Sequence, residues 1–133
     1  MQHIAILHSE YVDAILEGTK TIESRFSLHK REPFGTVKPG HIIYFKRKGG
    51  AIAARAVVDR VEAVDRLTPR KMKALQEKYG WAVGAPTSYW KGKRNAKYGT
   101  LIWLRNAEAV HAMIDPWALV KFCPGRAWYS IAA

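Results

Sequence analysis

Three charged residues of mixed sign lie close together in residues 18–25. Lys20, Glu23 and Arg25 follow Gly18 at offsets of two, five and seven positions. In an extended segment alternate side chains point the same way, so Glu23 and Arg25 would share one face about 7 Å apart. There Glu23 could accept hydrogen bonds from a nucleobase, Arg25 could hold a phosphate or brace Glu23, and Lys20 at the rim could neutralise a phosphate. The segment is therefore the first candidate for a binding or catalytic site, although the same charges could form a plain surface ion pair.

Short elements on both sides of this segment must position it. Residues 4–7 have the pattern of a strand, and residues 11–17 have that of an amphipathic helix with Ser9 as its N-cap. Gly18 suits the position after the helix, where a left-handed residue lets the chain turn, so we expect a positive φ there. Residues 21–25 then read as the strand that carries the charges.

This arrangement resembles a known family. The pattern G-x-K-x-x-E-x-R follows a helix, and an irregular stretch then leads to the turn Lys38-Pro39-Gly40 and a strand at residues 41–45. Helix, motif and turn together are similar to the ASCH domain, which belongs to the PUA-like superfamily of small β-barrels. Most members of that superfamily bind RNA. The resemblance covers about the first half of the chain and implies a nucleotide-binding cleft beside a barrel.

Hydrophobic alternation continues beyond the motif. Residues 41–48 and 51–67 read as two strands, and the glycine pair between them suits a tight hairpin turn. The alternation shifts at Asp59-Arg60, where a bulge would bend the long second strand as a small barrel requires.

The second half of the chain adds one clear helix and more strands. Thr68 and Pro69 suit the N-cap and first position of a helix that ends at Gly80. After an irregular stretch, strands are expected at residues 100–104, 107–113 and 125–131, with Arg105-Asn106 as the turn between the first two. The pattern predicts an α+β fold in a single domain over residues 1–133: a small, partly closed, mostly antiparallel PUA-like β-barrel of about six strands with two main helices.

Composition limits the kinds of protein to consider. The chain has 133 residues, of which 48% are hydrophobic, enough for one core. Cys123 is the only cysteine, so neither an intrachain disulfide nor a thiolate metal cage can form. The five histidines lack metal-ligand spacing, and we expect no metal and no cofactor. Without a long apolar run or a signal peptide, the expected location is cytoplasmic, with no membrane partner.

The charge of the chain indicates a polyanionic partner. Lysine and arginine number 22 against 11 aspartates and glutamates, which gives a net charge of +11. Clusters beside the predicted glycine turn and after the predicted helix would give salt-dependent phosphate contacts. We therefore expect RNA or another single-stranded nucleic acid as the partner. The residues assigned to this interface are Lys20, Glu23, Arg25, Lys46, Lys48, Trp90, Lys91, Lys93, Arg94 and Trp128.

Aromatic side chains could supply stacking surfaces for bases. A tryptophan taken singly more often packs in a core. Trp90 is the exception favoured here because it lies in a polar, basic loop that contains glycine. Trp128, Tyr89 and Tyr129 are the other candidates.

Whether the same cleft performs chemistry stays open at this point. A metal-independent ribonuclease needs a base, an acid and a cation near the 2′-hydroxyl and the phosphate. Lys20 and Glu23 could serve, with Tyr44 and Ser130 as weaker candidates. One branch of similar proteins hydrolyses N4-acetylcytidine with a lysine, a threonine and a glutamate. Lys20 matches that lysine, but Glu23 stands where the threonine is expected. A binder of a free nucleotide is the third alternative.

Overall fold

A computed structural model describes residues 1–131 of the chain. Its elements, in order, are β1 (Gln2–Leu7), α1 (Ser9–Glu17), β2 (Ile22–Ser27), β3 (Ile42–Arg47), β4 (Ile52–Val64), α2 (Pro69–Val83), α3 (Thr87–Gly92), β5 (Tyr98–Ala109), the 3-10 helix η1 (Pro116–Ala118) and β6 (Trp128–Ile131). Within this part of the chain, no helix has the length and apolar character needed to cross a membrane.

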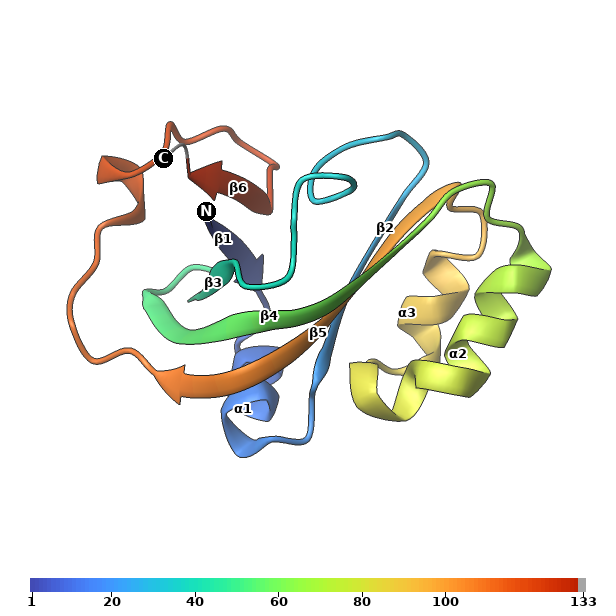
Figure 1. The fold of residues 1–133 in the computed structure, drawn as a ribbon, viewed down its shortest axis with the longest axis horizontal. Coiled ribbons are helices and arrows are strands. Elements are labelled where there is room, and N and C mark those ends of the chain that lie inside the picture. The colour runs from blue at the N-terminus through green and yellow to red at the C-terminus, as the bar shows by residue number, and fades with distance from the viewer. Residues whose placement is uncertain (132–133) are drawn as a thin grey trace.

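The strands form one curled sheet in the order β2-β5-β4-β3-β1-β6 (Figure 1). β1 and β3 run parallel, and the other neighbouring strands run antiparallel. The parallel pair forms because α1 and β2 lie between these strands in the chain, which gives the long crossover that parallel strands need. The predicted α+β, mostly antiparallel half-barrel is confirmed, and α3 is a short helix beyond the two that were expected.

Hydrophobic side chains fill the space on both faces of the sheet. One cluster lies on the concave face and includes Phe45, Val58 and Ile102, while a second cluster lies between the sheet and the helices α2 and α3. Leu101 belongs to the second cluster and its neighbour Ile102 to the first, because successive side chains of a strand point to opposite faces. β5 therefore joins the two cores.

Several local predictions are confirmed. Gly18 ends α1 with a φ of 84°, and Gly49 turns between β3 and β4 with a φ of 71°. The register between β4 and β5 shifts between Val58 and Arg60, which leaves Asp59 as the extra residue of a bulge. The Thr68 side chain caps α2 by accepting a hydrogen bond from the backbone N–H of Lys71, three residues further along the chain.

Other local predictions are wrong. α1 starts at Ser9 itself, with His8 at the N-cap position. α2 continues through Gly80 and ends before Gly84, whose φ is 70°. The expected turn at residues 105–106 is absent from the described chain, where β5 runs on as a single strand. Asn106, with a φ of 53°, is instead the extra residue of a bulge in β5. Between the pairs Arg55–Glu108 and Val57–Arg105, β5 advances by three residues and β4 by only two.

Candidate nucleic-acid interface

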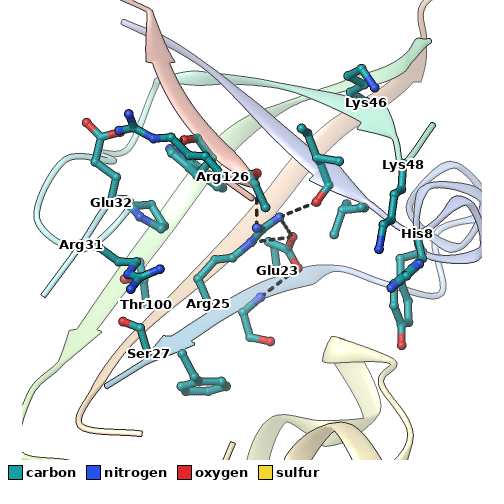
Figure 2. A pocket seen from close by; sticks show the side chains of 18 of the residues that line it. His8, Glu23, Arg25, Ser27, Arg31, Glu32, Lys46, Lys48, Thr100 and Arg126 are labelled. Atoms are coloured by element: carbon teal, nitrogen blue, oxygen red, sulfur yellow. Dashed lines mark hydrogen bonds and ion pairs between the residues drawn. The ribbon is translucent and has the colours of Figure 1, made fainter. Parts of the chain in front are cut away.

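The motif strand β2 turns its charged side chains to the concave face of the sheet. Glu23 pairs with Ile102 and Arg25 with Thr100 on β5, whereas Ser24 pairs with Leu101. Paired residues point to the same face, so Glu23 and Arg25 lie on the side of Ile102, away from α2 and α3. Both side chains line a cleft on this side of the molecule (Figure 2). The expected shared face is therefore present.

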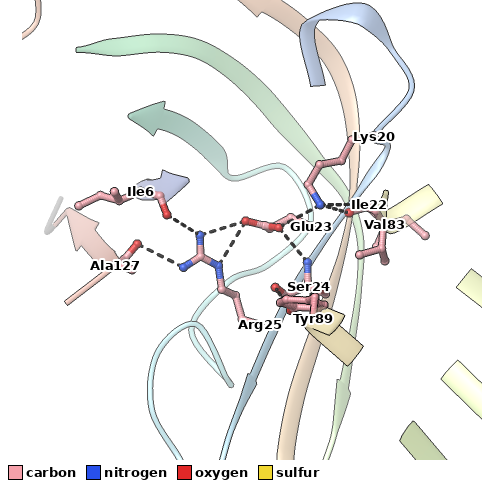
Figure 3. A network of polar contacts seen from close by, with 9 residues as sticks. All are labelled: Ile6, Lys20, Ile22, Glu23, Ser24, Arg25, Val83, Tyr89 and Ala127. Atoms are coloured by element: carbon pink, nitrogen blue, oxygen red, sulfur yellow. Dashed lines mark hydrogen bonds and ion pairs between the residues drawn. The ribbon is translucent and has the colours of Figure 1, made fainter. Parts of the chain in front are cut away.

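Glu23 is the centre of a buried polar network (Figure 3). Its side chain is 3% exposed. Its Oε1 accepts a hydrogen bond from the Ser24 backbone N–H at 3.0 Å and lies 3.3 Å from Lys20 Nζ. Its Oε2 accepts from Nε and Nη2 of Arg25, at 3.3 and 3.0 Å. Groups of the protein itself therefore occupy both carboxylate oxygens.

Lys20 lies inside the fold and not at the rim where the sequence predicted it. Its side chain is 4% exposed, and Nζ donates to the carbonyl oxygens of Ile22 at 3.0 Å and Val83 at 2.7 Å. With Glu23 as the third acceptor, all three hydrogens of the ammonium have partners. Val83 is the last residue of α2, where the helix dipole favours a cation. Lys20 thus ties the motif to α2.

Arg25 links the two edges of the curled sheet. Its Nη2 donates to the Ile6 carbonyl on β1 at 3.2 Å, and its Nη1 donates to the Ala127 carbonyl just before β6 at 3.4 Å. β2 and β6 are the opposite edges of the sheet. The guanidinium also lies over the Trp128 ring, 5.3 Å from its centre. Arg25 therefore closes the open side of the half-barrel.

The network keeps Glu23 ionised. Burial alone would raise the pKa of the Glu23 carboxyl, but the charges of Lys20 and Arg25 and their hydrogen bonds outweigh burial and lower this pKa below its ordinary value. A general base works best with a pKa near the operating pH. Glu23 is therefore suited to positioning Lys20 and Arg25 and poorly suited to proton transfer near neutral pH.

The cleft itself has a volume of about 1200 Å³ and a basic lining. Two acids line it: Glu23 is paired within the network, and Glu32 is paired with Arg126 at 3.1 Å. Its remaining cations are Arg31, Lys46, Lys48 and Lys93. Across residues 1–131, none of these four forms an ion pair. The cleft therefore has an excess of positive charge that is available to a ligand.

The predicted basic residues are only partly brought together. Lys46, Lys48 and Lys93 line the cleft. Lys91 and Arg94 line a separate hollow at the end of α3. The basic loop is thus divided between two places: Lys91 belongs to α3, whereas Lys93 and Arg94 follow the last residue of that helix.

The two predicted stacking tryptophans are unavailable to a base. Trp90 is 4% exposed and packs against Phe26 in the core beneath α3, with ring centres 5.7 Å apart, so its assignment to the interface is wrong. Trp128 lines the cleft but is 3% exposed, because Arg25 and His3 cover its ring. The buried Tyr89 hydroxyl bonds to Ser24, and burial raises the pKa of Tyr89 to about 12.

Tyr44 and Ser130, the weaker catalytic candidates, are not in the cleft lining. Ser130 instead bonds to the fully buried His3, with 3.0 Å between Oγ and Nδ1. His3 Nε2 lies 2.9 Å from His41 Nδ1, which also accepts the Lys38 backbone N–H at 3.1 Å. Since His41 Nδ1 is an acceptor, His3 carries its proton on Nε2, and its Nδ1 accepts from Ser130. Burial, then the His41 charge, lower the pKa of His3 to about 4.

Sequence reasoning missed several residues of the cleft lining. Arg31 and Arg126 stand in loops far apart in the sequence, and Trp117 and Phe122 lie in the long segment between β5 and β6. The fold brings them together through contacts between distant segments, such as the Arg126–Glu32 pair. The only local signal was the density of aromatic residues in an irregular segment.

The curled, mixed six-strand half-barrel, with α1 on one face and α2 and α3 on the other, has the PUA-like fold that was predicted. The chain belongs to the ASCH domain family, whose sequence model matches residues 6–111. The crystal structure of the ASCH protein from Zymomonas mobilis is similar, with a TM-score of 0.74 at 14% identity over 98% of this chain and 87% of that one. A tyrosine-to-phenylalanine variant of the same protein gives a TM-score of 0.75 at 16% identity, covering 98% of this chain and 90% of that chain.

A structure described as the hypothetical protein PH0355 is also similar, with a TM-score of 0.54 at 20% identity over 83% of this chain and 100% of that chain. At these identities the solved structures establish the fold alone. A comparison with curated proteins found no match.

Proposed function

We propose that this ASCH domain binds single-stranded nucleic acid, with RNA as the preferred form, in the cleft beside the Lys20–Glu23–Arg25 network. The observation that carries the proposal is the set of four cations on the cleft lining that have no ion-pair partner within residues 1–131, namely Arg31, Lys46, Lys48 and Lys93. PUA-like domains are commonly RNA-binding, which agrees with this charge. Both acids of the cleft are neutralised by neighbouring bases, so neither opposes the entry of a phosphate.

The charged motif supports the cleft from beneath. Arg25 joins β2 to β1, and Glu23 fixes the orientation of its guanidinium. In this proposal the ligand meets a surface that Glu23 and Lys20 hold in shape, and neither residue needs to touch a base. The motif thereby acts on binding through the geometry of the cleft.

Polar contacts of the motif favour binding over hydrolysis. A ribonuclease or an N4-acetylcytidine amidohydrolase using Lys20 and Glu23 would need one of them to exchange a proton or attack the substrate. Lys20 Nζ has three protein acceptors, and the pKa of Glu23 is lowered by its cations. The Lys20 ammonium and the Glu23 carboxylate therefore already bond to each other and to backbone groups, which leaves neither free to react with a substrate.

The test is a comparison of ligands by fluorescence anisotropy at low salt. The proposal expects a single-stranded RNA 12-mer to bind more tightly than the matching duplex and far more tightly than a mononucleotide. Incubation of the same RNA without metal ions should leave its length unchanged. Equal affinity for the mononucleotide would instead indicate a binder of free nucleotides, and steady cleavage would indicate a ribonuclease.

A further inference from the structure

An exposed aromatic pair stands at the cleft, away from both predicted tryptophans. Trp117 follows the start of η1, and Phe122 lies a few residues later in the segment between β5 and β6. Their exposed fractions are 38% and 55%, and both side chains line the cleft. Their ring centres are 4.9 Å apart at an angle of 74°. Large exposed aromatic surfaces of this kind commonly mark a binding site.

The pair is held in place by the sheet beneath it. The Trp117 ring meets the ring of the buried Tyr129 edge to face, with centres 5.6 Å apart. The Tyr129 hydroxyl accepts from the Cys123 N–H at 3.1 Å and donates to the Cys123 carbonyl at 3.0 Å, which fixes the chain next to Phe122. Asp115 Oδ1 accepts the Trp117 N–H at 3.0 Å. A platform ordered before binding loses little entropy when a ligand arrives.

Cations stand beside the platform. Lys46 Nζ lies 5.9 Å from the centre of the Trp117 ring, and Lys48 lines the same cleft. Neither lysine forms an ion pair within residues 1–131. An aromatic surface next to unpaired ammonium groups matches a flat base joined to a phosphate. A purely apolar peptide or an acyl chain would leave these charges without a partner.

We infer that Trp117 and Phe122 form the stacking platform for one unpaired base, which lies on the face of one ring and meets the other ring at its edge, while Lys46 and Lys48 hold the adjoining phosphate. This inference rests on the proposed function and specifies its ligand as a strand with at least one base out of any stack. A duplex does not fit, because both faces of its bases are already covered by neighbouring bases. The platform thus supplies the selectivity for single strands that charge alone does not give.

The test uses a single-stranded oligouridine 12-mer and an abasic oligomer of the same length, both with a fluorescent label. Trp117→Leu keeps apolar packing against Tyr129 and removes the flat ring. It should weaken oligouridine binding about fivefold to hundredfold and leave the affinity for the abasic oligomer unchanged. Phe122→Leu should act in the same direction and serves as the second variant if Trp117→Leu does not fold.

Trp81→Leu is the matched control, since Trp81 is 79% exposed on α2 and lies outside the cleft lining. It should change neither affinity. An equal loss of affinity for both oligomers, or no loss for oligouridine in either platform variant, would overturn the platform. The proposed function would still stand in that case if the wild type binds the single strands. A wild type that binds neither oligomer would overturn both.

Discussion

Arg25 on β2 donates a hydrogen bond to the Ile6 carbonyl on β1 at 3.2 Å, across the open side of the sheet. These strands are not neighbours, since β5, β4 and β3 lie between them in the sheet order. At this position the Arg25 side chain therefore joins two strands that no backbone pairing joins, whereas neighbouring strands of the sheet are joined by backbone hydrogen bonds. The family motif thus has a structural role that its exposed neighbours in the cleft do not share.

Removal of the Arg25 guanidinium should destabilise the fold. Arg25→Gln loses the contacts to Ile6 and leaves the buried Glu23 with Lys20 as its only cation. We expect the free energy of unfolding, measured with urea, to fall by about 3 kcal/mol. Arg55→Gln is the control, because its pair with Glu108 is largely exposed, and it should cost less than about 1 kcal/mol. Equal losses in the two variants would mean that Arg25 is an ordinary surface ion-pair partner.

Lys20 and Glu23 should be strongly coupled. Glu23→Gln leaves two cations without their buried acceptor, and Lys20→Met leaves the acceptor with one cation fewer. The double variant should lose about 1–3 kcal/mol less stability than the sum of the single losses, because its second change removes a charge that the first left unpaired. Additive losses in urea unfolding would contradict the coupling.

Glu23→Gln also separates two roles for the carboxylate in binding. Since its oxygens are occupied by Ser24, Lys20 and Arg25, we expect the variant to lose affinity equally for oligouridine, oligoadenine and oligocytidine. The reason is that Glu23 acts through Arg25. A loss confined to one base would show that Glu23 reads that base directly.

Acid should weaken the fold through His3. Its pKa of about 4 in the folded chain lies below the ordinary 6.5, so the unfolded chain takes up the proton first as the pH falls. The stabilisation is complete above about pH 6.5 and is lost as the pH falls toward 4, by up to about 3 kcal/mol. The lowered pKa of His41 adds to the loss in the same direction.

Urea unfolding at pH 7, 5.5 and 4 measures this dependence. His3→Gln should flatten it, whereas His29→Gln, a change at an exposed loop residue, should leave it intact. If the His3→Gln protein kept the full pH dependence of the wild type, the loss of stability in acid would come from another titratable group.

Gly99 should tolerate no side chain. A Cβ atom there would lie 2.7 Å from the Phe26 ring and 3.1 Å from Leu67, at the point where β2, β5 and the helix-side core meet. Gly99→Ala should lower the free energy of unfolding by about 1–3 kcal/mol. Gly92→Ala is the control, because a Cβ there meets nothing within 4 Å. A wild-type melting temperature for Gly99→Ala would contradict this packing.

Local chemistry made much of the fold predictable. The left-handed Gly18, the Thr68 cap and the bulge at Asp59 each follow from one or two residues and their neighbours. Arg105-Asn106 misled because a two-residue turn and a one-residue bulge both call for a residue at positive φ. Only the pairing of β5 with β4 along its length decides between them.

Residues of the site were harder to predict because burial depends on distant contacts. Trp90 lies in a polar sequence, but α3 turns its side chain toward Phe26 in the core. Lys20 is charged, but the carbonyl oxygens of Ile22 and Val83 make its burial acceptable. Trp117 lies at the cleft because its ring packs against Tyr129. The sequence around Trp117 does not indicate that contact.

The central claim is that the unpaired cations of the cleft hold phosphates, and the salt dependence of RNA affinity tests it most directly. The triple variant Lys46→Gln/Lys48→Gln/Lys93→Gln should flatten the slope of log affinity against log salt concentration by about two for a single strand. Lys73→Gln/Lys91→Gln/Arg94→Gln removes the same charge outside the cleft and should leave the slope near that of the wild type. Equal slopes for the two triple variants would contradict a nucleic-acid site in this cleft.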